Sequence, residues 1–432
     1  MYIAAPPRRM TAPPSIALVI PTYNGASYVE ACLDSVAALD YPRDRLETIV
    51  VDNGSTDGTS HLLSRRYPWV RGVALERNTG FAAACNAGAR AATANCLALA
   101  NNDMRLDPLW LRELVAAFDP PGGFPCVAGL ILDATGDRVD FADAYVNFYG
   151  MGSQGGFGRA LEDVEIVDRR ELLFACGGSM LVDRALFLEL GGFDETFFAY
   201  FEDVDFGWRL WLAGHRTRLA AGARSFHRHH GTADVFPQPQ RTVLYDRNSL
   251  LMLAKNLDDA NLHRVLAAAL CLTAERALAD SGADPSAYVL GGPAPPDRET
   301  VPANAVARLN AVSQFVRLLD HALAERKRIQ ALRHRPDSEI FAQFRRPFWP
   351  LYRSEERYLE TSILVAEAFG MAGLFDGPRD DVEVLEAVRR ARLEAPPPPS
   401  LTPARAAWSH VPEPIRRALR PLLRRLRSSN GG

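Results

Sequence analysis

Apolar runs and helical patterns alternate over the first hundred residues of the chain. The run Ile16–Ile20 and the run "LETIVV" are each followed by a polar turn and then by apolar residues at helical spacing. The segments "GVALERNTGFAAACNAGARAA" and "NCLALANND" add a third strand, a helix and a fourth strand. Apolar strands that alternate with helices predict a parallel sheet covered on both faces. We therefore expect an α/β fold with a Rossmann-like, mostly parallel sheet and helices on both faces.

Polar clusters follow three of these strands. "PTYN", "DNGSTD" and "NND" each stand where a strand is expected to end. In open parallel sheets, ligands bind at the carboxyl ends of the strands. The clusters therefore predict one binding site at this edge of the sheet.

The rest of the chain changes character several times. Residues 140–160 mix aromatic residues with glycine and predict a mobile loop over a site, and helical periodicity dominates beyond Gln240. At 432 residues, the chain is long enough for two or three domains. The predicted segments are a disordered tail (1–14), the α/β domain (15–240), a helical domain (241–385), a proline-rich linker (386–404) and a basic amphipathic tail (405–432).

Composition excludes some classes of protein. The net charge of −3 argues against nucleic acid as a partner. The six cysteines are scattered and show no metal-ligand spacing, which is typical of a reducing compartment. Prolines occupy the place of a signal-peptide core, and no apolar run approaches the ~20 residues of a spanning helix. We expect a cytoplasmic protein.

The basic tail leaves two interpretations open. In "IRRALRPLLRRLR", leucines can share one face opposite the arginines. The segment is either a solvated or subunit-docking tail, or an interfacial helix that binds anionic lipid on the inner face of the plasma membrane.

Asp52 is the best candidate for a nucleotide contact. A carboxylate at a strand end can accept a hydrogen bond from the imide N–H of uracil or thymine, which cytosine lacks. Thr22 and Asn24 would line the same pocket. The alternative is that Asp52, Ser55 and Asp57 cap the next helix; we favour ligand contact for Asp52 and capping for the other two.

Asp103 and a histidine are candidates for a metal site. Oxygen ligands suit Mg²⁺ or Mn²⁺, and these ions complete their shells with phosphate oxygens and water. Asp103 is the single carboxylate of "NND", so a histidine of "SFHRHHGT" is the expected second ligand: His227, His229 or His230.

The stretch "FFAYFEDVDFGWRL" places three carboxylates, Glu202, Asp203 and Asp205, among aromatic rings. A carboxylate in apolar surroundings can act as the base that deprotonates a sugar hydroxyl. A second could bind acceptor hydroxyls. The alternative is that Glu202 and Asp205 hold Arg209 and other cations at a helix start. We expect one catalytic and at least one structural carboxylate.

Taken in order, these motifs resemble the inverting family two glycosyltransferases with the GT-A fold. The set "PTYN", "VVDNGSTDG", "NTGFAAACNAG", "NND", "GGSMLVDRALFLELGGFDE" and "YFEDVDFGWRL" covers about half of the chain. It looks most like the bacterial rhamnosyl- and galactofuranosyltransferases of cell-wall or surface polysaccharide synthesis.

The resemblance implies roles for individual residues. Asp203 matches the general base, and Asp103 with His227 matches the metal site. Asn101 departs from the family by replacing the first acid of Asp-x-Asp, which removes a charge near the metal. The implied nucleotide-sugar-binding residues are Pro21, Thr22, Tyr23, Asn24, Asp52, Asn53, Asn78, Gly80, Asn86 and Asn102. The implied acceptor and sugar pocket contains Gly177, Gly178, Glu202 and Trp208.

The expected reaction is transfer of a sugar, such as rhamnose or galactofuranose, from a UDP- or dTDP-sugar to a hydroxyl of a glycan or lipid-linked glycan, with inversion. A glycoside hydrolase is disfavoured, because adjacent Glu202 and Asp203 cannot easily flank one bond at the ~5–9.5 Å that such enzymes need. The remaining alternative is a non-catalytic carbohydrate-binding or assembly protein that retains the fold.

Overall fold

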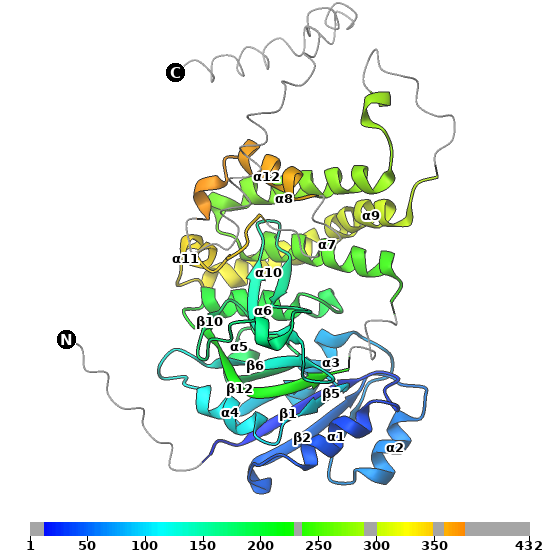
Figure 1. Ribbon diagram of the computed structural model, residues 1–432, viewed down its shortest axis with the longest axis vertical. Helices are drawn as coiled ribbons and strands as arrows, with labels where there is room; N and C mark the ends of the chain where they lie inside the picture. Colours follow the sequence, from blue (N-terminus) through cyan, green and yellow to red (C-terminus); the bar gives the residue numbers. More distant parts are fainter. Residues whose placement is uncertain (1–12, 229–235, 289–299, 349–357, 376–432) are drawn as a thin grey trace, which may run out of the picture. The chain divides into compact units, whose positions relative to one another are not determined.

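The computed structural model describes residues 13–228, 236–288, 300–348 and 358–375 (Figure 1). All of them belong to one compact unit, Met1–Asp381. The predicted boundary at 240/241 therefore marks a change of secondary structure within a packed unit. Independent folding of the two parts stays a prediction, and the proline-rich linker, the basic tail, His229 and His230 lie outside the described residues.

The central sheet is mixed and contains ten strands, with the main order β10-β12-β6-β11-β4-β1-β2-β3. Its strands are β1 (Ile16–Thr22), β2 (Leu46–Asp52), β3 (Arg71–Ala74), β4 (Cys96–Ala100), β5 (Met104–Leu106), β6 (Cys126–Asp133), β7 (Val139–Phe141), β10 (Glu171–Leu172), β11 (Ser179–Asp183) and β12 (Thr217–His227). The strands β4, β1, β2 and β3 run parallel, as do β6 and β12. Between these groups β11 runs antiparallel to both β4 and β6.

The four predicted strands form the parallel half of the sheet. Every residue of β1 is buried, since both faces of this central strand are covered. In the register of β1 with β2, Thr22 lies opposite Asp52, so the two polar loops that follow start side by side. The predicted α/β class is confirmed.

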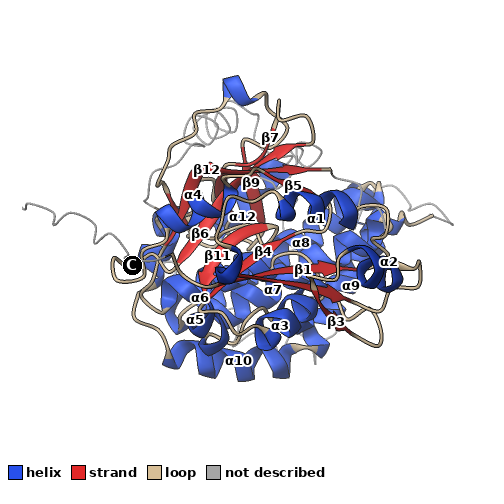
Figure 2. Ribbon diagram, turned by 90° about the horizontal axis from the view of Figure 1, so that it is seen from below, coloured by secondary structure: helices blue, strands red, loops and turns tan. Residues whose placement is uncertain are grey.

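Helices cover both faces of the sheet. Figure 2 shows α3 (Phe81–Ala91) and α5 (Arg184–Glu189) on one side and α1 (Val29–Ala37) and α4 (Trp110–Ala117) on the other. The short helix α2 (Thr59–Arg66) contacts the edge strand β3. The helix α6 (Glu202–Leu212) is buried along most of its length and leads toward the helical region.

The predicted loop over residues 140–160 contains strands. β7 pairs with β6, and β8 (Asp143–Val146) pairs with β9 (Gly152–Gly155) in a separate two-stranded sheet. These strands are short and β9 has glycine at both ends, so their sequence lacks the sustained alternation that predicts a strand. The expectation of an irregular loop is wrong here, although the segment does border the cavity described below.

Beyond residue 237 the described chain is helical, as predicted. The helices are α7 (Gln238–Asn256), α8 (Asp259–Ser281), α9 (Ala303–Arg317), α10 (Leu319–Ala331), α11 (Asp337–Phe341) and α12 (Leu359–Ala368). Helix α7 contacts α6 on one side and α8, α9 and α10 on others, so it joins the helical region to the sheet domain (Figure 1).

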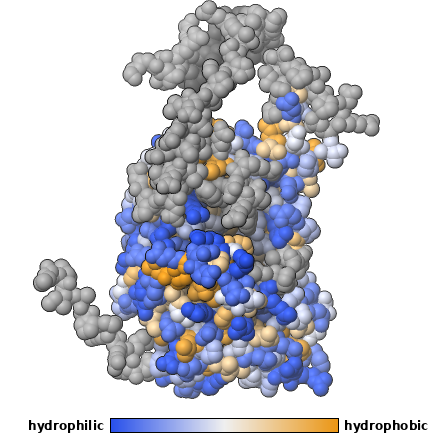
Figure 3. All heavy atoms as spheres, in the orientation of Figure 1, coloured by the Kyte–Doolittle hydropathy of each residue, from blue (hydrophilic) through white to orange (hydrophobic). Residues whose placement is uncertain are grey.

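No helix among the described residues combines the length and apolarity needed to cross a bilayer. On the face shown in Figure 3, hydrophilic side chains predominate and apolar ones form limited patches.

Candidate active site

A cavity of about 380 Å³ lies at the start of α6. Asp103, Glu202, Asp203 and His227, which are far apart in the sequence, all line it. Gly177 and Gly178, predicted for the sugar pocket, line it as well. Aromatic rings form much of the remaining wall: Phe81, Phe141, Phe157, Phe174, Tyr200, Phe201, Phe236 and Tyr245. The cavity is therefore acidic at one part of its wall and apolar over the rest.

Asp203 occupies the first turn of α6, where the N-terminal end of the helix favours negative charge. Its Oδ2 accepts a hydrogen bond from the N–H of Gly177 at 2.9 Å, and its Oδ1 accepts one from the N–H of Val204 at 2.8 Å. Burial raises the pKa of Asp203, and these two N–H groups oppose that rise. The carboxylate is thus held in one orientation beside the cavity.

Gly178 packs closely against the side chain of Asn101 behind the cavity. A Cβ on this residue would lie 2.8 Å from the side-chain nitrogen of Asn101, closer than real contacts allow. The N–H of Asn101 in turn donates to the carbonyl of Gly178. The glycine lets the "NND" loop approach the strand β11, which brings Asp103 toward the cavity.

The loop that leads into α6 has an unusual backbone. Phe198, Tyr200 and Phe201 all have positive φ, between 65° and 72°, a conformation that costs energy for residues with a side chain. The side-chain amide of Asn248 on α7 lies 2.8–3.1 Å from the carbonyl oxygens of Phe197, Ala199 and Tyr200. Helix α7 therefore stabilises the strained loop that places the rings of Tyr200 and Phe201 in the cavity wall.

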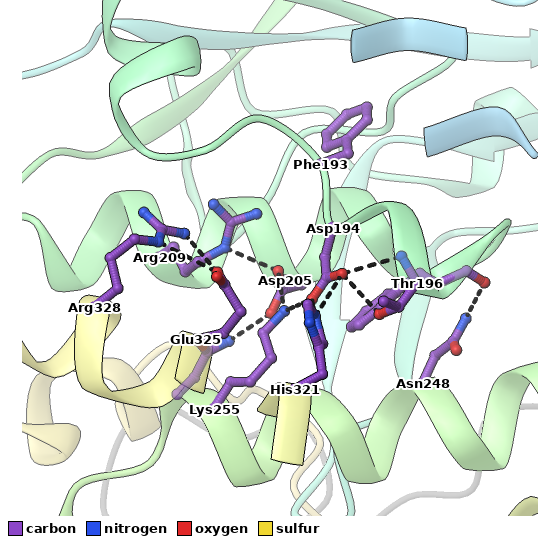
Figure 4. Close-up of polar contacts among 12 residues, drawn as sticks. Phe193, Asp194, Thr196, Asp205, Arg209, Asn248, Lys255, His321, Glu325 and Arg328 are labelled. Atoms are coloured by element: carbon purple, nitrogen blue, oxygen red, sulfur yellow. Dashed lines mark hydrogen bonds and ion pairs between the residues drawn. The ribbon is translucent and has the colours of Figure 1, made fainter. Parts of the chain in front are cut away.

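Three acidic residues of α6 have three different environments. Asp205 is fully buried and accepts hydrogen bonds from Arg209, Lys255 and Asn256 (Figure 4). Asp203 is bound to backbone N–H groups, whereas Glu202 makes no ion pair within the described residues. The structural role expected for at least one carboxylate is confirmed for Asp205, whereas the alternative in which Glu202 also pairs with cations does not hold among the described residues.

His227, the last residue of β12, lies beside Asp103. The strand pairing places His227 opposite Met104, the residue after Asp103, and the imidazole Nε2 is 3.3 Å from Asp103 Oδ1. The other ring nitrogen, Nδ1, is 2.6 Å from Oδ2 of Asp140 on β7. A carboxylate on Nδ1 orients a histidine so that Nε2 can bind a metal.

Two carboxylates, those of Asp103 and Asp140, contact the imidazole of His227. Burial by itself would lower the pKa of His227, but the hydrogen bonds and charges of Asp103 and Asp140 outweigh it and raise the pKa to about 10. The pair of carboxylates therefore favours a positive charge at this point, whether it is carried by a proton or by a cation.

The predicted nucleotide-binding residues gather at the carboxyl edge of the parallel strands. The side-chain amide of Asn102 donates to Thr22 Oγ1 at 2.8 Å, and the Asn53 N–H donates to the Thr22 carbonyl. Asn53 also bonds the 78–80 segment through Asn78, Thr79 and Gly80. Pro21 is buried within β1, and Tyr23 and Asn24 follow in the loop. These residues do not line the 380 Å³ cavity but lie at the adjoining edge of the sheet.

Asp52 is more strongly engaged than we predicted. It is 6% exposed, Oδ1 accepts from the N–H of Ser55 at 2.9 Å, and Oδ2 accepts from the hydroxyl of Ser60. Local hydrogen bonding, the alternative interpretation, thus describes the carboxylate better than a contact to a base.

Asn86 and Trp208 also need correction. The amide of Asn86 bonds both backbone groups of Phe193 and the carboxylate of Glu195, which uses both of its N–H donors. It anchors the loop before α6 and has no donor left for a nucleotide. Trp208 is fully buried and packs edge-on against Phe344, outside the cavity lining. It belongs to the core between α6 and the helical region.

With this geometry established, sequence comparison gives the family. Residues 17–190 match the profile of the family described as "Glycosyl transferase family 2". This match covers less than half of the chain and makes residues 17–190 similar to a glycosyltransferase family 2 domain. The matched segment includes the parallel strands, the "NND" segment and β11, and the match stops before α6.

Relatives with assigned names are distant. The chain is 29% identical over 236 residues to the N-acetylglucosaminyl-diphospho-decaprenol L-rhamnosyltransferase of Mycobacterium tuberculosis, covering 49% of this chain and 75% of that protein. It is 30% identical over 149 residues to the glycosyltransferase AglE of Haloferax volcanii, covering 32% of this chain and 46% of that protein. The chain therefore spans less than half of the archaeal relative.

Similarity to solved structures is weaker still. The mannosyltransferase PcManGT of Pyrobaculum calidifontis, solved with GDP-Man and Mn²⁺, aligns with a TM-score of 0.42 and 20% identity over 74% of this chain and 88% of that one. GalNAc-T7, solved with UDP, GalNAc and Mn²⁺, aligns with a TM-score of 0.48 and 17% identity over 58% of this chain and 49% of that one.

Sequence reasoning missed several residues that shape the site. Asp140 comes from the segment that we had predicted to be a loop over a site, and Tyr245 and Asn248 come from the helical region; we had predicted no role for any of these three residues. Lys255 and Asp194 bond each other behind α6. One signal was present in the sequence: Lys255 is one of only two lysines in the chain and stands inside an apolar helical pattern, where a charged residue needs a partner.

Proposed function

We propose that the protein is an inverting glycosyltransferase that moves a sugar from a nucleotide diphosphate to a hydroxyl of a glycan or lipid-linked glycan. One observation carries the proposal: Asp203 lines the same cavity as Asp103 and His227, next to the polar edge of a glycosyltransferase family 2 domain. A nucleotide at that edge would extend its diphosphate and sugar toward Asp203.

In the proposed mechanism Asp203 acts as the general base. The hydrogen bonds from Gly177 and Val204 hold the carboxylate in place, and its raised pKa keeps it basic enough to accept the proton of an acceptor hydroxyl. The acceptor oxygen then attacks the anomeric carbon as the bond to the diphosphate breaks, which inverts the configuration. The apolar wall around Asp203 limits the access of water that would otherwise compete as an acceptor.

Asp103 and His227 fit a divalent cation such as Mg²⁺ or Mn²⁺. Their facing atoms are 3.3 Å apart, close to the ~3 Å edge between neighbouring ligands of an octahedral ion with bonds of 2.0–2.1 Å. No cluster of three or more metal-ligating side chains occurs among the described residues, so phosphate oxygens and water would supply the other ligands. A bound cation would neutralise the charge of the leaving diphosphate.

Asp140 supplies the negative charge that Asn101 lacks. We expect Asp140→Asn to weaken Mn²⁺ binding by about 10–100-fold, because a carboxylate behind a metal-bound histidine orients the ring and raises its basicity. Calorimetric titration of the full-length protein with Mn²⁺ in the presence of UDP measures this effect. Asp137→Asn, an exposed neighbour on the same segment, serves as the control. Equal affinity in Asp140→Asn and the wild type would contradict the assignment.

The donor is proposed to be a UDP- or dTDP-sugar. Support for a nucleotide comes from the gathered strand ends, and support for a deoxyhexose comes from the printed name of the mycobacterial rhamnosyltransferase. Because Asp52 is bound within its own turn, the choice of base needs a direct test. Incubation with dTDP-rhamnose, UDP-galactofuranose, UDP-hexoses and GDP-mannose, followed by mass analysis of the product, identifies the donor. The proposal fails if no donor yields a transfer product.

The acceptor is proposed to be a sugar hydroxyl in cell-wall or surface polysaccharide synthesis. The aromatic rings of the cavity can pack against the C–H-rich face of a sugar ring. A lipid-linked acceptor would bring the chain to the inner face of the plasma membrane, where the arginines of residues 405–432 would contact anionic lipid.

A further inference from the structure

The carboxyl group of Glu202 lies in the cavity wall without the partners that its two acidic neighbours have. Glu202 is 5% exposed, and its Oε2 is buried with no hydrogen-bond partner among the described residues. Buried polar atoms in folded proteins are almost always hydrogen-bonded, so an exception at a cavity indicates a group that awaits a ligand.

Nearby donors and cations are already engaged elsewhere. Arg209 and Lys255 both bond Asp205, and Lys255 also bonds Asp194 (Figure 4). The N–H groups of Gly177 and Val204 are directed at Asp203. An ionised Glu202 would therefore be a buried negative charge with no ion-pair partner and only its own backbone N–H as a donor among the described residues, which is a costly arrangement in a protein.

We propose that Glu202 is a neutral carboxylic acid that donates a hydrogen bond to a hydroxyl oxygen of the sugar bound in the cavity, while Asp203 is the ionised member of this adjacent pair. The identity of the ligand as a sugar rests on the proposed function; the protonation of Glu202 does not. A carboxylate can only accept hydrogen bonds, whereas a carboxylic acid both donates and accepts. The two adjacent acids would thus have different tasks, one binding and one basic.

The groups around Glu202 agree with this assignment. Burial raises the pKa of Glu202 well above its usual value, and the charges of Asp203 and Asp205 raise it further. Across from α6, Cys85 on α3 and Cys176 before β11 are thiols whose pKa values are also raised, so both stay neutral. The other titratable groups that line the same cavity are Asp103, Asp140, Tyr200, His227 and Tyr245. In this set His227 is the single positive group, and it is already bound to Asp103 and Asp140.

Infrared difference spectroscopy of the full-length protein at neutral pH tests the protonation directly, without any substrate. We expect the C=O stretch of a protonated carboxyl to be present in the wild type and to decrease in Glu202→Gln. The control Glu165→Gln, which changes an exposed carboxylate, should leave that band unchanged. If the wild type and Glu202→Gln give the same band, Glu202 is ionised and the proposal is wrong.

A second measurement uses stability instead of spectroscopy. An acid with a raised pKa in the folded state binds its proton more tightly there than in the unfolded chain, so wild-type stability should fall as the pH rises above about 4.5. Glu202→Gln lacks this dependence. In thermal unfolding from pH 5 to pH 8, the Tm of the variant should therefore rise relative to the Tm of the wild type as the pH increases. A difference in stability that stays constant with pH would overturn the proposal.

The contact with sugar is tested with the donor that the mass screen identifies. Glu202→Ala removes the donor group and should lower kcat/KM by about 10–100-fold, whereas Glu202→Gln, whose amide still donates, should lose several-fold less. Equal losses in both variants would contradict a hydrogen-bond donor role. If the screen finds no transfer, the proposed function fails, but the infrared and stability results still decide the state of Glu202.

Discussion

Asp203→Asn should reduce turnover by about 10²–10⁴-fold, the contribution that a general base typically makes. The amide cannot accept the acceptor's proton, yet it is isosteric and can keep the hydrogen bond from Gly177. Donor binding, measured by calorimetry with the nucleotide, should change little, because the polar strand ends lie outside the altered position. Turnover is measured under substrate saturation, so the effect appears in kcat.

Asp137→Asn is the matched control, since this exposed carboxylate lies outside the site. Its turnover should equal that of the wild type. The pH profile provides a further check: since Asp203 must be ionised and its pKa is raised, kcat should fall on the acid side at a higher pH than a free aspartate would give. Asp203 and Glu202 interact, so the midpoint of that limb belongs to the pair. An Asp203→Asn variant with near wild-type turnover would exclude Asp203 as the base.

Lys255→Met should lower the free energy of unfolding by about 3–5 kcal/mol, the usual cost of removing one partner from a buried ionic group. Lys255 is 1% exposed and lies between Asp194 and Asp205, so its loss removes the shared cation and leaves Asp205 with Arg209 and Asp194 with His321 as their remaining ion-pair contacts (Figure 4). Urea denaturation at neutral pH measures the change. The control is Lys327→Met, because Lys327 is the chain's only other lysine and is exposed. This substitution should leave the free energy of unfolding almost unchanged.

The loss of stability in Lys255→Met should become smaller as the pH falls. Lys255 holds the pKa of Asp194 far below its usual value although burial alone would raise it, so the pair stabilises the folded state above pH ~4 and loses that contribution as the pH falls. The difference in the free energy of unfolding between Lys255→Met and the wild type should therefore be largest at neutral pH and shrink in acid, where Asp194 becomes protonated in the variant. A gap that grows in acid would contradict the role of the ion network.

The parallel half of the sheet could be predicted because its signals are local. A strand such as Ile16–Thr22 is apolar throughout, since both of its faces are covered, and the polar residues follow at its end. Asp103, Asp203 and His227 could be named from their motifs, and the structure brings all three to one cavity. Their chemical roles stay predictions.

Other features of the site could not be predicted, because they depend on contacts between residues that are far apart in the sequence. Asp140 reaches His227 across 87 residues of sequence through the short strand β7. Trp208 follows Asp203 by five residues, which places it about 140° around α6 and so toward the helical region. Asn86 carries an amide that could bind a ligand, but both of its N–H donors bond Phe193 and Glu195. Each error concerns a side chain whose partner is distant in sequence.

The hydrogen bonds from Asn248 to the loop before α6 have a consequence for exchanging segments between related enzymes. Helix α7 supplies both this amide and Tyr245, so a chimera joined at the apparent end of the sheet domain would separate the aromatic wall from its support. Acceptor preference should therefore transfer only together with α7, the first helix of the C-terminal region. A chimera should be joined after Asn256, the last residue of α7, rather than before Gln238, its first residue.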